Sequence, residues 1–181
     1  MLKMLFHLIL ICSLFCGCGY HFRTIGEPIG ISLDSIAIPL FSSSSSYLGY
    51  EGEFTRVVRE EFIANSRVRM ERKEHAQVVL KGRISSITTT PLTFSITQET
   101  IHGYPSTDVV TSSRTMKVRV EAGLFERATG TVLWKDSNLT GEASFSVSSD
   151  PLINQYNQRQ AFISIAQYIA SIIYSKTMER F

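Results

Sequence analysis

The chain has 181 residues, with 18 Lys and Arg against 16 Asp and Glu, which gives a formal net charge of +2. This length suits one domain with a substantial hydrophobic core better than it suits two domains. No run of like charge occurs in the sequence, which argues against a nucleic-acid-binding protein, because such proteins normally carry a basic face.

The N-terminal segment resembles the signal of a bacterial lipoprotein. One lysine supplies a positive charge, and the apolar run from Leu5 to Leu14 is shorter than the roughly 20 residues that a bilayer span needs. Cys18 is the better lipid acceptor because small Gly17 precedes it, whereas Cys16 follows a bulky aromatic residue. The alternative is an ordinary secretory signal that is cut near Gly19.

The resemblance to lipoprotein signals implies a diacylglycerol in thioether linkage to Cys18 and, after cleavage, an acyl group on its new amino group. We therefore expect a signal peptide over residues 1–17, a lipid anchor and tether over residues 18–34, and a single domain over residues 35–181. Two or three acyl chains anchor firmly, since each buried CH₂ contributes about 0.8 kcal/mol. We expect no other cofactor. All three cysteines lie at or before Cys18, so the mature chain would have no free thiol, which suits an oxidising compartment.

The first part of the expected domain predicts a strand, a helix and a second strand. The strand covers residues 35–41, where apolar Ile36, Ile38 and Leu40 alternate with other residues and Pro39 indicates a strand edge or end. The period becomes helical over residues 50–65 and returns to an alternating pattern over residues 77–88. The apolar face of the helix consists of Phe54, Val57, Val58 and Phe62. The apolar face of the second strand consists of Val78, Leu80, Ile84 and Ile87.

The middle of the chain predicts a long hairpin. Residues 89–113 are polar and rich in Ser and Thr, and Phe94 and Ile96 alternate there with polar residues. Residues 114–125 form the clearest strand, with one wet face, which indicates an antiparallel sheet. Its expected core residues are Met116, Val118, Val120, Ala122 and Leu124, and its expected water-facing residues are Lys117, Arg119 and Glu121.

The last third predicts one more strand and a long helix. A tight turn over residues 128–131 leads into a broken strand from Val132 to Phe145. Asp150 can cap a helix that has Pro151 at its first position. The apolar stripe of this helix recurs at spacings of three and four and consists of Phe162, Ile165, Ala166, Ile169, Ile172 and Ile173.

The predicted order is therefore β-α-β-β-β-α. We expect an α+β two-layer sandwich, in which two helices pack on one face of a four-stranded, mixed or mostly antiparallel sheet. The other face of the sheet must meet solvent or a partner.

The chemistry of a catalytic or metal site is missing from the sequence. His21, His75 and His102 are scattered, with no second ligand at metal spacing. Neither a nucleophile elbow nor a phosphate-binding glycine loop nor a zinc-protease motif occurs. Acidic pairs such as Glu60 with Glu61 are better explained as solvated surface than as catalytic carboxylates. We therefore expect a protein without catalytic or metal-binding residues.

Three features together resemble the lipopolysaccharide (LPS)-assembly lipoprotein family, LptE. They are the Gly17-Cys18-Gly19-Tyr20-His21-Phe22 sequence, the predicted element order and the long C-terminal helix. The resemblance implies an outer-membrane lipoprotein that plugs the lumen of the LptD-like LPS-assembly β-barrel, helps the barrel to fold and aids delivery of LPS to the outer leaflet. Gly19 replaces the aspartate that commonly retains lipoproteins in the inner membrane, which favours the outer membrane.

The resemblance also implies basic residues that touch LPS phosphates, in the loop between the second and third strands and near the start of the last helix. Residues 89–113 contain no Lys or Arg, which departs from that pattern. The nearest candidates are Arg114, Lys117 and Arg159, and none matches a family position residue by residue. The alternative for each is a solvated surface cation.

A second class of function remains open. A stand-alone envelope lipoprotein that binds a periplasmic enzyme or a secretion pore would also fit, since the turn from Thr129 to Trp134 occurs in other envelope lipoproteins. A hydrolase has no residues to support it.

Overall fold

The computed structural model describes residues 33–43, 49–101 and 104–179. The expected signal, Cys18 and the tether up to residue 32 lie outside the described residues. In chain order the elements are β1 (Ser35–Ala37), β2 (Ser42–Ser43), α2 (Glu51–Asn65), β3 (Arg69–Met70), β4 (Val78–Ile101), β5 (Tyr104–Glu126), β6 (Val132–Ser146) and α3 (Pro151–Met178).

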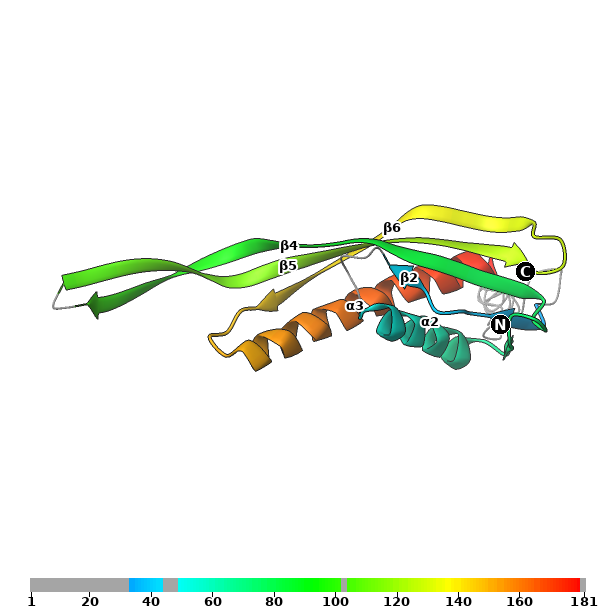
Figure 1. The fold of residues 1–181 in the computed structure, drawn as a ribbon, viewed down its shortest axis with the longest axis horizontal. Helices are drawn as coiled ribbons and strands as arrows, with labels where there is room; N and C mark the ends of the chain where they lie inside the picture. The colour runs from blue at the N-terminus through cyan, green and yellow to red at the C-terminus, as the bar shows by residue number, and fades with distance from the viewer. Residues whose placement is uncertain (1–32, 44–48, 102–103, 180–181) are drawn as a thin grey trace, which may run out of the picture.

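The strands form one mixed sheet, and both helices lie on the same side of it (Figure 1). The strand order is β3-β1-β4-β5-β6, with β2 beside β4. The short strands β1, β2 and β3 pair in parallel, whereas β4, β5 and β6 form an antiparallel meander. The predicted α+β class with two helices and a mixed sheet is confirmed.

The predicted strand count of four is wrong, because the described residues alone form a sheet of six strands. The two additional strands, β2 and β3, contain two residues each. Such strands are too short to show alternation in a sequence, since a period of two needs several residues to become visible.

The predicted strand over residues 35–41 is also shorter than expected. It ends at Ala37, and Leu40 is 66% exposed instead of facing the core. Pro39 follows the break, and the Ile38 carbonyl accepts hydrogen bonds from the Arg59 guanidinium at 2.6 and 2.9 Å rather than from a neighbouring strand. The alternation is therefore lost at this point.

The strand β5 divides the sheet into two faces, as its sequence predicts. Its even-numbered residues from Met116 to Leu124 are 0–3% exposed, whereas Lys117 and Arg119 are exposed on the opposite side. The predicted core residues of β4 are buried on the same side as the helices. One face is thus apolar and covered, and the other is bare of helices.

The predicted hairpin over residues 89–113 is confirmed. The β4–β5 ladder continues to the pair of Ile101 with Tyr104, whereas the β5–β6 ladder stops at the pair of Ser113 with Ser146. Beyond that pair, the hairpin extends past both helices as a two-stranded ribbon (Figure 1). At roughly 3.3 Å per residue, the 24-residue β4 spans about 80 Å.

The long helix α3 begins and packs as predicted. The Asp150 carboxylate accepts a hydrogen bond from the Leu152 amide at 2.8 Å, and Pro151 occupies the first turn. The stripe from Phe162 to Ile173 is buried except for Ile172, which is partly buried. Among the described residues, α3 included, no helix combines the length and apolarity needed to span a membrane.

Close packing on the covered face depends on glycine at two strand positions. A Cβ atom added at Gly82 would lie 2.1 Å from the ring of Phe41, which is 1% exposed. A Cβ atom added at Gly141 would lie 2.8 Å from Cγ2 of Ile165 on α3. These strands therefore accept the Phe41 ring and the helix only because the two positions carry no side chain.

We predict that Gly82→Ala destabilises the chain by about 1–3 kcal/mol, since the added methyl group overpacks the core against an aromatic ring that cannot move aside. Gly52→Ala is the matched control, because Gly52 lies in α2 with nothing within 4 Å of the added Cβ atom. The control should be neutral or slightly stabilising. Denaturant unfolding measures both, and equal stability of the two variants would contradict the packing at Gly82.

Candidate functional site

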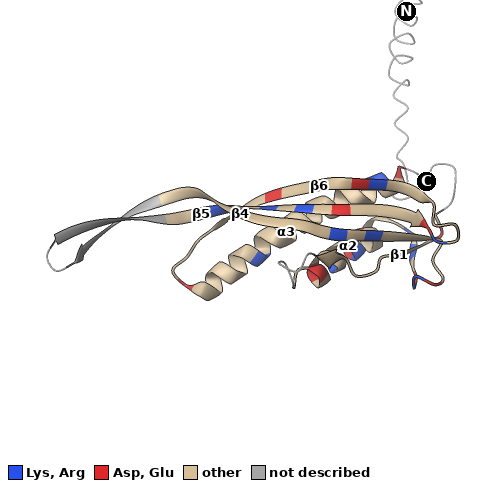
Figure 2. Ribbon diagram, turned by 45° about the horizontal axis from the view of Figure 1, so that its top comes forward, with Lys and Arg blue, Asp and Glu red and all other residues tan. Residues whose placement is uncertain are grey.

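The bare side of the sheet carries most of the strand charges, and we call it the open sheet face. Figure 2 shows blue and red bands across β4, β5 and β6. The alternation of β5 and the cross-strand register place these residues on one side. The open sheet face contains the cations Lys81, Arg83, Lys117, Arg119 and Lys135 and the carboxylates Glu121 and Glu142.

Both carboxylates of the open sheet face are paired within the chain. Lys117 Nζ lies 2.5 Å from an oxygen of Glu142, and Arg83 Nη2 lies 3.2 Å from an oxygen of Glu121. These exposed pairs contribute little to stability, about 0–1 kcal/mol each. They do neutralise both carboxylates, so the excess positive charge comes from the remaining cations.

A shallow hollow lies between β4, β5 and β6. Lys81 of β4 and Lys135 of β6 pair with Gly123 of β5 from its two sides. The hollow forms between them because Gly123 has no side chain. Lys81 Nζ lies 5.0 Å from the centre of the Phe125 ring, a cation–π geometry. Within residues 33–43, 49–101 and 104–179, neither Arg119 nor Lys135 has a side-chain hydrogen bond or an ion pair. These cations are available to a ligand or a partner.

The structure does not bring the candidates Arg114 and Lys117 together. Arg114 lies two positions before Met116 on β5, so its side chain is on the same side of the strand. Its partner in the neighbouring strand, Phe145, packs against the core, so Arg114 lies on the helix side of the sheet. Lys117 belongs to the open sheet face. No rigid ligand on one face can contact both side chains.

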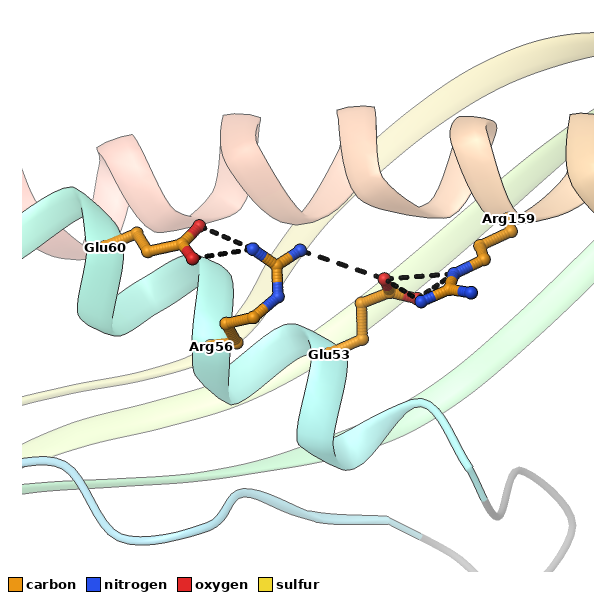
Figure 3. A network of polar contacts seen from close by, with 4 residues as sticks. All are labelled: Glu53, Arg56, Glu60 and Arg159. Carbon is orange, nitrogen blue, oxygen red and sulfur yellow. Dashed lines mark hydrogen bonds and ion pairs between the residues drawn. The ribbon is translucent and has the colours of Figure 1, made fainter.

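The third candidate, Arg159, is bound within the chain. Its guanidinium donates to both oxygens of Glu53 at 3.0–3.1 Å, and Glu53 also pairs with Arg56, which in turn binds Glu60 (Figure 3). The Glu53 carboxylate raises the pKa of Arg159, mainly through the hydrogen bonds and secondarily through its charge. The Glu53 side chain is only 12% exposed. Because Glu53 belongs to α2 and Arg159 to α3, this bidentate contact, the Arg159–Glu53 fork, connects the two helices.

The same network borders a cleft between the first turns of α2 and the first turns of α3. Burial, and then the charge of Glu53, raise the pKa of Tyr50, whose ring lies 4.4 Å from that of Phe162. The cleft is lined by Gly49, Tyr50, Gly52, Glu53, Arg56, Gln155, Gln158 and Arg159. Its charged groups, Glu53, Arg56 and Arg159, bind one another, which makes the cleft a helix–helix junction. In the described part of the chain, no three His, Cys, Asp or Glu side chains gather as metal ligands.

Comparison with protein families identifies the chain. The family model described as LptE, lipopolysaccharide-assembly, matches residues 33–177. The chain belongs to the LptE family. The match runs from just before β1 into the last turns of α3, so it covers both helices and every strand of the sheet. No curated protein sequence matches the chain.

Solved structures with the fold of this LptE-family chain share little of its sequence. A protein from Xanthomonas campestris is 12% identical, with 88% of this chain and 93% of that chain covered and a TM-score of 0.51. An uncharacterized lipoprotein B from Nitrosomonas europaea is also 12% identical, with coverages of 88% and 90% and a TM-score of 0.49. The rare lipoprotein B from Shewanella oneidensis is 16% identical, with coverages of 78% and 92% and a TM-score of 0.40. Of these, the Xanthomonas structure supports the fold.

Sequence reasoning on this LptE-family chain did not single out Lys81, Arg83, Arg119 and Lys135 as one group. The signal is present in part, since the alternation of residues 77–88 puts Lys81 and Arg83 on one side of their strand, and that of residues 114–125 does the same for Lys117 and Arg119. The missing information was the register between strands, which sets Lys81 and Lys135 on either side of Gly123. Register depends on turn geometry and core packing across the whole sheet.

Proposed function

We propose that this LptE-family chain is a non-catalytic outer-membrane lipoprotein that plugs the LptD-like LPS-assembly β-barrel and assists its folding. In this role it aids the delivery of LPS to the outer leaflet. The observation that carries the proposal is the bare, charged face of a sheet whose other face is sealed by two helices. Such a body exposes polar surface around an apolar core, as a plug in a polar barrel lumen requires.

The anchor in this proposal is the lipid on Cys18, with residues 1–17 removed as the signal. The tether then connects the acylated cysteine to Leu33, the first described residue, which is buried. A tether of about 15 residues reaches at most ~50 Å when extended, which holds the domain near the membrane and leaves it free to enter a barrel.

The β4–β5 ribbon also fits a plug. At its base, the Thr93 hydroxyl lies 2.9 Å from that of Ser112 and 2.6 Å from that of Ser113, so polar side chains tie the two strands together. The ribbon carries no Lys or Arg and only two acidic residues, Glu99 and Asp108, so most of its length can lie along a polar wall. Among the LPS-contact candidates, Lys117 and Arg114 remain exposed on opposite faces, whereas Arg159 first has to leave Glu53.

We predict that Cys18→Ser abolishes incorporation of a fatty-acid analogue, because the thioether needs the cysteine sulfur. Cys16→Ser is the matched control and should label like the wild type. The measurement is gel fluorescence of the purified full-length chain after metabolic labelling. Labelling of Cys18→Ser, or loss of labelling in the control, would overturn the assignment of the acceptor.

Depletion of the chain should lower the amount of correctly assembled LPS-assembly barrel in outer-membrane fractions. The outer leaflet should then lose LPS, and large hydrophobic antibiotics should become more toxic. Barrel abundance by quantitative mass spectrometry and antibiotic sensitivity measure the two effects. Normal barrel abundance with normal permeability after full depletion would exclude the plug and favour a stand-alone lipoprotein with a periplasmic enzyme or secretion pore as its partner.

A further inference from the structure

We propose that the open sheet face is the surface that this chain turns toward the barrel, where it meets a wall rich in Asp and Glu side chains. The inference rests on the proposed function and adds to it the orientation of the domain and the chemistry of the partner. The partner is a protein surface whose carboxylates face Lys81, Arg119 and Lys135.

Charge balance gives the first argument. The open sheet face carries five cations and two carboxylates, and both carboxylates already pair with Lys117 and Arg83. The excess on this face is therefore three positive charges, although the whole chain has a net charge of only +2. A concentrated positive surface favours contact with a negative one.

Of the ten described cations that lie off this face, five are engaged within the chain. Arg159 and Arg56 bind carboxylates of α2, and Arg59 donates to a backbone carbonyl of residue 38. Arg119 and Lys135 have no such side-chain partner in the part of the chain that the structure describes. A partner that supplies carboxylates would give these two their first ion pairs.

The layout of the charges favours a protein wall over a phosphorylated lipid. Lys81 and Lys135 lie two strands apart, which is about 10 Å across the sheet. Lys117 pairs with Thr88 of β4, which is seven positions from Lys81, so these two cations are about 23 Å apart along the strands. A phosphate group is best held by donors that converge on it. Here the cations are spread over three rigid strands and interleaved with Glu121 and Glu142, which suits many separate contacts along an extended surface.

The test reverses charge on the open sheet face in the full-length lipoprotein. Arg119→Glu combined with Lys135→Glu is compared with Arg67→Glu combined with Lys73→Glu, which makes the same charge change at exposed positions off this face. The amount of LPS-assembly barrel that co-purifies with each tagged variant from outer membranes is measured at low and at raised salt. Thermal melting of the purified variants is measured alongside.

We expect the open-face pair to lose at least about tenfold of the co-purified barrel with an unchanged melting temperature, because attraction becomes repulsion at two contacts. The control pair should stay within about twofold of the wild type, and raised salt should weaken the wild-type complex. If the charge-reversed pair melts early, Arg119→Gln with Lys135→Gln replaces it and should lose barrel to a smaller extent. Retention of the barrel by the folded open-face variant would overturn the proposal.

Two other results separate this inference from the proposed function. A wild-type chain that brings down no barrel would overturn the plug itself and the orientation with it. An open-face variant that keeps the barrel but loses binding to LPS vesicles would assign the face to LPS and overturn the protein-wall proposal alone.

Discussion

The alternation of side chains along β5 is the constraint on which the rest of the structure depends. Met116, Val118 and Val120 enter the core, and Lys117 and Arg119 between them point to the opposite side. A slip of one residue would bury the cations and expose the apolar side chains, at a cost of several kcal/mol for each unpaired charge. Because β4 and β6 both pair with β5, its alternation sets the two faces of the whole meander.

The packing of the covered face supports the backbone of the open one. Both helices seal the apolar side, and α3 approaches β6 closely because Gly141 carries no side chain. The Arg159–Glu53 fork then joins the two helices to each other at their first turns. This packing sets where each charged residue lies on the outer face, which suits recognition of a partner surface and requires no catalytic group. Membership of the LptE family is consistent with such a role in LPS assembly.

The long elements were predictable because their periodic patterns extend over many residues, as in the stripe of α3 and the alternation of β5. The strands β2 and β3 were not, since two residues are too few to show a period of two. The partner of Arg159 was equally hidden, because Glu53 lies 106 positions away in the sequence. By contrast, the opposite orientation of Arg114 and Lys117 is implied by the sequence, as residues three apart on a strand face opposite sides.

Thiol accessibility along β5 tests the central claim most directly. Single cysteines are placed in turn at positions 116 to 121 of the full-length lipoprotein and labelled with a maleimide, in the purified chain and in outer membranes that contain the barrel. In the purified chain the odd positions should react and the even positions should be protected. In the assembled complex the odd positions should become protected as well. Equal labelling of odd and even positions would contradict the division into two faces, and undiminished labelling of odd positions in the complex would contradict the open sheet face as the partner surface.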